Sequence, residues 1–429
     1  MEANRSESQT HFIRKAIDRP NRPVLPSRHT TLENIVVIRK AECQRRWIFR
    51  CRLEREIPQV LDNNSRINIA ILTINDNLNY GNRLQNYALQ QILKEYGNVT
   101  TIRMLTHADS RFSYWKAILR DWKQRVKATA FRFGSRNQRL LSQRMRSGIA
   151  FTRKLVPDDS ARLSQFRGLK SKEALDLVVI GSDQVWNYHW LDKGDLKLRL
   201  GMFEPKLRKI SYAASIGVDD LSDSTAPIFE NGLPGISHIS VREDKAKELV
   251  QSVPNMDAEV VLDPTLMLTP EQWSQTFRGF VPEHDGYVLT YFLGKPSDEQ
   301  ETVMREYAES RGLRIRRIRD YSDPETYVAG PQDFVELFAK ADYVFTDSYH
   351  ACCFSLIFAK DFKVFNRSGF EGGKNMNSRM QTLMRLFDLS DTMGDNTAID
   401  RIDHDAVLAK LQEYRELSHS WLTRAIANE

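Results

Sequence analysis

The segment with the clearest chemical potential is a polar run in which a histidine follows a buried strand. Ser348, Tyr349 and His350 come after the apolar residues of DYVFTDS and open a helical pattern. An imidazole at such a junction can act as a general acid or base near neutral pH. Ser348, Tyr349 and the first amides of the helix can bind a donor phosphate, because a helix N-terminus carries partial positive charge. A purely structural histidine is the alternative, but these surroundings favour function.

An arginine and a glutamate end another expected strand, ISHISVRED at residues 236–244. Arg242 can hold a phosphate or carboxylate of a donor through two parallel hydrogen bonds. It can equally pair with a nearby acidic residue and only stabilise the fold, and the sequence favours neither role. Glu243 is expected to face the same cleft.

A mixture of carboxylate, amide and aromatic side chains follows the buried strand DLVVIGSD. Asp183 ends this strand, and Gln184, Trp186 and Asn187 come next. Carboxylates and amides bind sugar hydroxyls, while an aromatic ring packs on the apolar faces of a sugar. Capping of the next helix by Ser182 or Asp183 is the alternative. We favour an acceptor-binding site.

The loop NDNLNYGN, between the strand INIAILTI and a helix, contributes a fourth group. Asn79, Tyr80 and Asn82 stand where backbone amides and a helix N-terminus can hold an anion or a polar ligand. A loop that simply turns the chain explains these residues about as well. We assign them to the acceptor side of the cleft.

Alternating strands and helices must position these groups. Apolar runs of strand length at 67–74, 176–183 and 209–217 alternate with helical periodicity, and a second series starts at Tyr287. This pattern predicts an α/β fold of two Rossmann-like, doubly wound domains that face a cleft, with the site at the carboxyl ends of the strands. The expected parts are a basic, poorly ordered extension at 1–65, domains at 66–235 and 236–400, and a C-terminal helix at 401–429.

Composition excludes several classes of protein. No run of about 18 apolar residues is present, and no apolar stretch follows the N-terminus, which argues against a membrane span and a secretory signal. The four cysteines form no CxxC pair, so we expect no metal site and a reducing cytoplasm. Walker A, G-x-S-x-G and H-E-x-x-H motifs do not occur, which disfavours common hydrolases.

A basic helical insertion is expected at 110–155. Residues 111–154 contain thirteen Lys and Arg but one acidic residue, Asp121. Aromatic and aliphatic residues recur there every three or four positions, as in an amphipathic helix. An anionic membrane surface is a fitting partner, and a merely solvated face is the alternative. We expect no specific nucleic acid, because no readout motif accompanies the charge.

Six motifs, taken together, resemble the polysaccharide pyruvyltransferase family over about residues 67–389. They occur in family order: NYGNRLQNYALQQILKEYG, DLVVIGSDQVWN, KISYAASIG, ISVRED, VVLDPTLML and GPQDFVELFAKADYVFTDSYHACCFSLIFAKDF. The resemblance implies a glycosyltransferase-B-like fold and phosphoenolpyruvate as donor, with no metal or organic cofactor. The product would be a pyruvate ketal on an exopolysaccharide, capsule or cell-wall glycan precursor.

The resemblance matches His350 to the family's motif histidine and Arg242 to its strand-end arginine. The common Ser-Phe-His-Gly form reads Ser348-Tyr349-His350-Ala351 here, and some members carry an arginine in place of Ser348. We expect a cytoplasmic enzyme, peripheral at the inner membrane face, acting on a sugar, oligosaccharide or lipid-linked glycan. The alternatives are a nucleotide-sugar glycosyltransferase of the same fold and a non-catalytic glycan- or anion-binding homologue.

Overall fold

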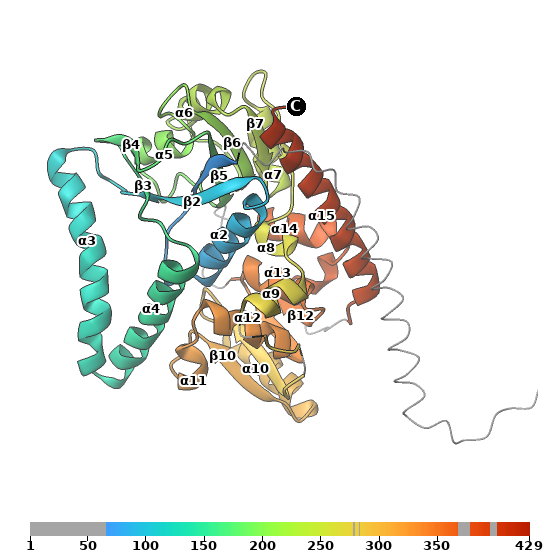
Figure 1. Cartoon of the computed structure of the whole chain (residues 1–429). Helices are drawn as coiled ribbons and strands as arrows, with labels where there is room; N and C mark the ends of the chain where they lie inside the picture. Colours follow the sequence, from blue (N-terminus) through green and yellow to red (C-terminus); the bar gives the residue numbers. More distant parts are fainter. Residues whose placement is uncertain (1–65, 278, 283, 368–377, 395–400) are drawn as a thin grey trace, which may run out of the picture. The chain divides into compact units, whose positions relative to one another are not determined.

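Two β-sheets organise the part of the chain that the computed structural model describes, which is residues 66–429 apart from 278, 283, 368–377 and 395–400 (Figure 1). The extension at 1–65, predicted to be poorly ordered, lies outside the described residues. The first sheet has eight strands in the order β4-β3-β2-β1-β5-β6-β7-β8, and the second has four in the order β10-β9-β11-β12. All pairs are parallel except β3 with β4. The predicted α/β fold with two Rossmann-like halves is confirmed.

The strands of the first sheet are β1 (Ile67–Leu72), β2 (Gly97–Met104), β3 (Ala161–Ser164), β4 (Gly168–Ser171), β5 (Leu177–Asp183), β6 (Arg208–Ala214), β7 (His238–Val241) and β8 (Glu259–Val260). Those of the second sheet are β9 (Tyr287–Tyr291), β10 (Arg314–Ile318), β11 (Tyr343–Thr346) and β12 (Asp361–Val364). The helices are α2 (Tyr80–Leu93), α3 (Arg111–Ala130), α4 (Arg136–Leu155), α5 (Lys193–Arg199), α6 (Ala226–Gly232), α7 (Asp244–Gln251), α8 (Pro264–Met267), α9 (Pro270–Thr276), α10 (Asp298–Ser310), α11 (Pro324–Tyr327), α12 (Pro331–Lys340), α13 (Tyr349–Ile357), α14 (Ser378–Leu386) and α15 (His404–Ala427).

The change from one sheet to the other comes later in the chain than the predicted boundary at 235/236. Ile239 on β7 pairs with Ser211 on β6, and β8 pairs with β7, so both strands extend the first sheet. The second sheet begins only at Tyr287. Strands and helices follow each other through this region, with α8 and α9 in succession before β9, and periodicity alone does not reveal which sheet a strand joins.

Alternate side chains of each central strand enter different cores. In β1, Ile69 and Ile71 join one cluster, while Ala70 and Leu72 join another on the opposite face. The first cluster also contains Leu289 of β9, so the two sheets share one hydrophobic core. Burial on both faces explains why the strands read as continuous apolar runs.

Helices α2, α12 and α13 meet in this shared core. The ring of Tyr80 stacks on Phe334 at 4.7 Å between centroids, and its hydroxyl donates to the Ala329 carbonyl at 2.7 Å. The C-terminal helix α15 returns to the first sheet, where Trp421 lies 6.1 Å from Tyr212 and Arg208 donates to the Ile426 carbonyl at 2.6 Å. These contacts hold α2 against α12 and α15 against β6.

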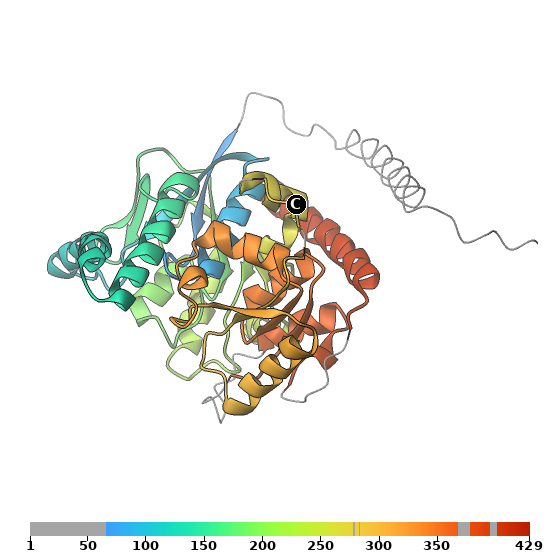
Figure 2. The same ribbon diagram turned by 90° about the horizontal axis from the view of Figure 1, so that it is seen from below.

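The basic insertion forms a helical hairpin of α3 and α4 (Figures 1 and 2). Ser110 and Ser135 each cap one helix through a capping box, which explains where the two helices begin. Near its start α3 packs through Tyr114 and Ala117 on Leu105. Among the described residues, no helix combines the length and apolar character that crossing a membrane requires.

Candidate active site

Residues from several strand ends converge at the carboxyl edge of the first sheet. The parallel register aligns Asp183 with Ala214, and Ala214 with Val241, so Asp183 and Arg242 lie at the same edge. Asp263 follows β8 and caps α8, accepting from the Thr265 amide at 2.9 Å. His350 reaches this group from the first turn of α13, which follows the second sheet's β11.

Arg242 links two of the carboxylates. Its guanidinium donates to Asp263 at 2.7 Å and to Asp183 at 3.1 Å, and its side chain has no exposed surface. The same group lies 4.3 Å from the centroid of the Tyr349 ring. Burial alone would lower the pKa of Arg242, but the carboxylates and Tyr349 reverse this and raise it. The geometry therefore matches the ion-pairing alternative, and both terminal nitrogens of Arg242 are engaged.

His350 faces Asp263 without a direct hydrogen bond. Its Nε2 lies 3.7 Å from Asp263 Oδ2 and is buried with no hydrogen-bond partner. On the other side the ring leaves no room at Gly81, where an added Cβ would stand 2.1 Å from Nδ1. The imidazole is thus held in place between helix α2 and a buried carboxylate, with one nitrogen left free for a proton or a ligand.

Both carboxylates beside Arg242 favour the ionised state. Burial raises the pKa of Asp263, but the facing His350 and Arg242 outweigh burial and lower that pKa well below its ordinary value. The pKa of Asp183 is also lowered, because Arg242 and His350 together outweigh its burial. A buried carboxylate remains charged only when such partners compensate its lost hydration.

The predicted loop before α2 reaches the same cluster through one residue. Asn82 donates from Nδ2 to Asp183 at 2.7 Å and accepts from the Asp76 amide at 2.9 Å. Asn79 caps α2 by accepting from the Asn82 amide at 3.2 Å. Tyr80 points into the shared core, and burial raises the pKa of its hydroxyl. Asn82 therefore touches the charged group, while Asn79 and Tyr80 shape the helix that carries it.

The remaining predicted residues line or support the loops after β5 and β6. Glu243 accepts from Ser215 at 2.8 Å and from the Gly217 amide at 3.1 Å, and burial raises its pKa. Gln184 and Asn187 are buried beside Gly217, where an added Cβ would meet their amide nitrogens at 2.1 and 3.2 Å. Glu243 thus fixes the loop after β6, and Gly217 of that loop packs against the side-chain amides of Gln184 and Asn187.

Ser348 precedes α13 but makes no capping bond through its side chain. Its amide donates to Thr346 Oγ1 at 3.0 Å. The neighbouring Asp347 accepts from the Leu293 and Gly294 amides at 2.6 and 2.8 Å and from Arg367 at 2.9 Å. These bonds fix the turn between β11 and α13, and so the direction of the first helical turn.

Sequence reasoning missed three residues of this site. Asp263 lies in VVLDPTLML, where Asp before Pro signals a helix cap but not an ion pair. Arg379 lies on α14, within electrostatic reach of Arg242, Glu243 and Asp183. Its burial, together with the charge of Arg242, lowers the pKa of Arg379 to about 10. Gly81 lies in the loop NDNLNYGN, and nothing in that loop's sequence indicates that it packs against His350. No local pattern identifies Arg379, because its neighbours come from three other segments.

One other group has the composition of a metal site. His107, Asp192 and Asp195 place their ligand atoms within 4.8 Å of one another. Their atoms are already engaged, since Asp195 accepts from the His107 amide at 2.8 Å and Gln165 donates to both carboxylates at 2.9 Å. We therefore assign these three residues a structural role in joining α5 to the loop after β2.

Comparison with known families decides how this site is interpreted. The family model described as polysaccharide pyruvyl transferase matches residues 79–369, more than half of the chain. The chain belongs to the polysaccharide pyruvyl transferase family. The matched span contains each predicted site residue of this family member, from Asn79 to His350.

Solved structures that align with most of this chain include an epimerase, a polymerase and a glycosyltransferase. UDP-GlcNAc 2-epimerase from Neisseria meningitidis, bound to UDP-GlcNAc, is 9% identical with a TM-score of 0.35, covering 82% of this chain and 98% of that chain. The wall teichoic acid polymerase TagF is 12% identical with a TM-score of 0.39, covering 85% of each chain. A glycosyltransferase from Rickettsia africae is 10% identical with a TM-score of 0.37, covering 83% and 99%. A search of curated proteins found no match.

Proposed function

We propose that this pyruvyl transferase family member moves the pyruvyl group of phosphoenolpyruvate onto two hydroxyls of one sugar, forming a cyclic ketal. The observation that carries the proposal is His350. Its buried Nε2 has no hydrogen-bond partner and faces an ionised carboxylate 3.7 Å away. An imidazole nitrogen of this kind can pass a proton to or from a bound ligand.

The reaction requires protonation of the donor's methylene carbon and departure of its phosphate group. His350 delivers a proton to the methylene carbon of phosphoenolpyruvate, and C2 becomes electrophilic. One sugar hydroxyl forms a bond to C2, the C2–O bond to phosphate breaks, and a second hydroxyl closes the ketal. Of the two hydroxyl protons, one restores His350 and the other leaves with phosphate. No step requires a metal or an organic cofactor.

The donor's negative charge requires cations beyond Arg242. Asp183 and Asp263 together outweigh the single charge of Arg242, so this trio alone repels a phosphorylated carboxylate. We assign the donor's anionic groups to Arg379, to protonated His350 and to the amides after Ser348. Arg242 is then a positioning residue that holds both carboxylates, and Tyr349 lies against its guanidinium.

Asp183 is the residue best placed to orient the acceptor. It stays ionised, and each oxygen receives one bond, from Asn82 at 2.7 Å and from Arg242 at 3.1 Å. A carboxylate can accept about four hydrogen bonds, so lone pairs remain for sugar hydroxyls. Gln184 and Asn187 follow in the same loop and complete the acceptor side. This arrangement favours a hydroxyl-rich ligand.

Ligand-induced thermal stabilisation tests the donor, with phosphoenolpyruvate compared against UDP- and GDP-sugars. A ligand at 100 times its Kd adds about 2.7 kcal/mol to the stability of the protein. We expect stabilisation by phosphoenolpyruvate, and loss of about 10²–10⁴-fold in ketal formation in His350→Ala. Stabilisation by a nucleotide sugar alone would instead make the protein a glycosyltransferase, and normal turnover by a folded His350→Ala protein would remove the assigned role.

We also propose that α3 holds the enzyme at an anionic membrane surface, where a lipid-linked acceptor would lie. Large apolar side chains at three- and four-residue spacing form one exposed face of α3, including Trp115 at 55% and Trp122 at 59% exposure. Basic residues such as Lys116 and Lys123 flank this face. Apolar burial combined with attraction to anionic lipid is the basis of interfacial binding.

Vesicle sedimentation tests the membrane contact. Wild-type protein should bind vesicles containing phosphatidylglycerol, whereas replacing Lys and Arg by Gln across 116–146, or Trp115 and Trp122 by Ala, should release it. Phosphatidylcholine vesicles provide the uncharged control. Wild-type partitioning of the Gln-substituted protein would contradict the proposal.

A further inference from the structure

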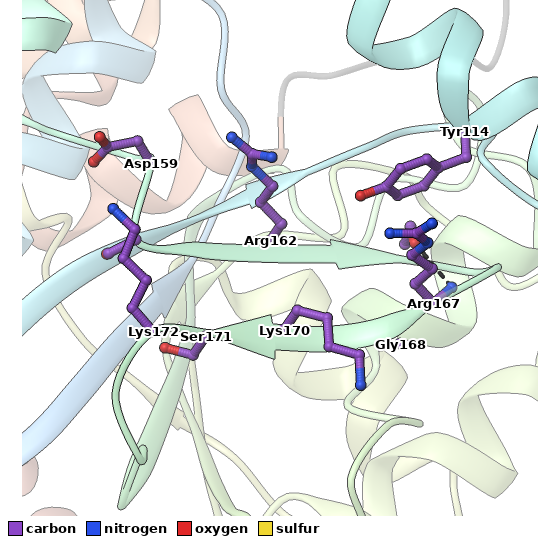
Figure 3. A pocket seen from close by; sticks show the side chains of 10 residues that line it. Tyr114, Asp159, Arg162, Arg167, Gly168, Lys170, Ser171 and Lys172 are labelled. Carbon is purple, nitrogen blue, oxygen red and sulfur yellow. Dashed lines mark hydrogen bonds between the residues drawn. The ribbon is translucent and has the colours of Figure 1, made fainter.

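Asp183, Arg242, Asp263 and His350 form the His350 cluster. A cationic feature lies outside this cluster, on the β3–β4 hairpin. Its strands border an open hollow of about 290 Å³, lined in part by Arg162, Arg167, Lys170 and Lys172. Figure 3 shows Arg162 between Lys172 at one end of the hairpin and Arg167, beside Tyr114, at the other. One acidic residue, Asp159, belongs to the lining. The hollow therefore combines a defined shape with an excess of positive charge.

The pairing of the two strands places like charges opposite each other. Arg162 is the antiparallel partner of Lys170, whereas the neighbouring pair Leu163 and Leu169 is buried. Like charges directly opposite each other in a sheet are destabilising. In the part of the chain that the structure describes, neither side chain forms an ion pair that would offset this. A bound anion would supply the missing countercharge.

Arg167 is held toward the hollow by its own contacts. Its guanidinium lies 4.6 Å from the centroid of the Tyr114 ring, and its amide donates to Ser164 Oγ at 3.1 Å. Tyr114 is largely buried and belongs to the first turns of α3. Stacking on an aromatic ring orients a guanidinium while leaving its in-plane N–H groups available. The hollow therefore lies between the hairpin and the start of α3, the helix that carries the exposed apolar face.

We infer that this hollow is a binding site for a diphosphate group. Ligand pockets begin at about 300 Å³, so the hollow suits a compact anion rather than a whole oligosaccharide. Guanidinium groups bind phosphate oxygens through paired hydrogen bonds, and lysines add mobile charge. If the proposed function holds, the natural source is the diphosphate of a lipid-linked acceptor, because the site adjoins α3. A soluble diphosphate is the other source of the same chemistry.

Calorimetric titration of the full-length protein with inorganic pyrophosphate tests the site. The variant is Arg162→Gln/Lys170→Gln, and its matched control is Lys94→Gln/Lys206→Gln, in which two exposed lysines outside the hollow are changed. We expect the hairpin variant to bind about tenfold more weakly than the control, since each of the two exposed charges contributes up to about fivefold. Its melting temperature should be unchanged or higher, because the repulsion between strands is removed.

Vesicles then identify the source of the diphosphate. Phosphatidylcholine vesicles with polyprenyl diphosphate should recruit wild-type protein but not the hairpin variant, and plain vesicles should recruit neither. If pyrophosphate binding depends on the hairpin but recruitment does not, the site stands and its ligand is soluble.

Equal pyrophosphate affinity in the hairpin variant and its control would overturn the site. So would pyrophosphate binding that is lost in Arg379→Gln and kept in the hairpin variant, since the anion would then occupy the His350 cluster. The proposed function is judged separately. If phosphoenolpyruvate fails to stabilise wild-type protein while pyrophosphate binding still requires the hairpin, the site stands without that function.

Discussion

Substituting Gly81 by alanine tests the assigned position of His350 without any knowledge of the substrate. The new Cβ would lie 2.1 Å from Nδ1 and 2.4 Å from Cγ of His350, whereas ordinary contacts begin at 3.4 Å. The ring must therefore retreat by more than about 1 Å, into space bounded by Tyr349 and Asp263. Overpacking of this kind costs about 1–3 kcal/mol, partly offset by about 1 kcal/mol of better helix propensity.

A double-mutant cycle separates the collision from other effects. In a His350→Ala background the ring is gone, so Gly81→Ala should be neutral or stabilising by up to about 1 kcal/mol. We expect a coupling free energy of about 1–3 kcal/mol between the two positions, measured by urea unfolding of the four proteins. Gly235→Ala is the control, because nothing lies within 4 Å of an added Cβ there.

The activity of Gly81→Ala follows from the same displacement. A shift of about 1 Å in a catalytic group can reduce turnover by about 10²-fold. If Gly81→Ala costs the same free energy of unfolding in both backgrounds, within about 0.5 kcal/mol, His350 does not lie against α2 and our account of the site is wrong.

Three further predictions concern charge. Arg379→Gln should weaken phosphoenolpyruvate binding about tenfold or more in thermal-shift titrations, because a charge-assisted hydrogen bond is lost. Asp263→Asn should lower the free energy of unfolding by about 3–5 kcal/mol relative to the exposed control Asp220→Asn, since it leaves buried Arg242 undercompensated. The bond to Glu95 raises the pKa of His419 above its ordinary 6.5 despite partial burial. Its stabilisation is therefore complete below about pH 6.5 and is lost as pH rises through the folded-state pKa, a dependence that His419→Gln should remove.

Unchanged phosphoenolpyruvate affinity in Arg379→Gln would place the donor elsewhere. A stability of Asp263→Asn equal to that of its control would mean that Arg242 needs only one carboxylate. For His419, whose side chain is nearly half exposed, solvent screening limits the effect to about 0.2–1 kcal/mol. A matching pH profile in His419→Gln would assign the dependence to another group.

The amino-acid sequence alone predicts the strands and helices and the general position of the site. Apolar runs buried on both faces, such as 67–72 and 177–183, and helical periodicity between them define an α/β chain. Polar residues directly after strands indicate the site, because parallel strands end at a common edge. This reasoning predicts His350 as a site residue, and in the structure His350 lies in the first turn of the helix that follows β11.

The partners of each polar side chain, in contrast, depend on how the folded segments pack. Arg242 ends a strand whether it clamps a donor or binds two carboxylates, and Asp263, 21 residues later in the chain, is what engages it. Sequence gives no sign that α2 brings Gly81 against His350, or that Arg162 faces Lys170 across the hairpin. Local patterns reflect burial and backbone geometry along one segment, whereas ion pairs and close contacts depend on segments that meet only when the sheets pack together.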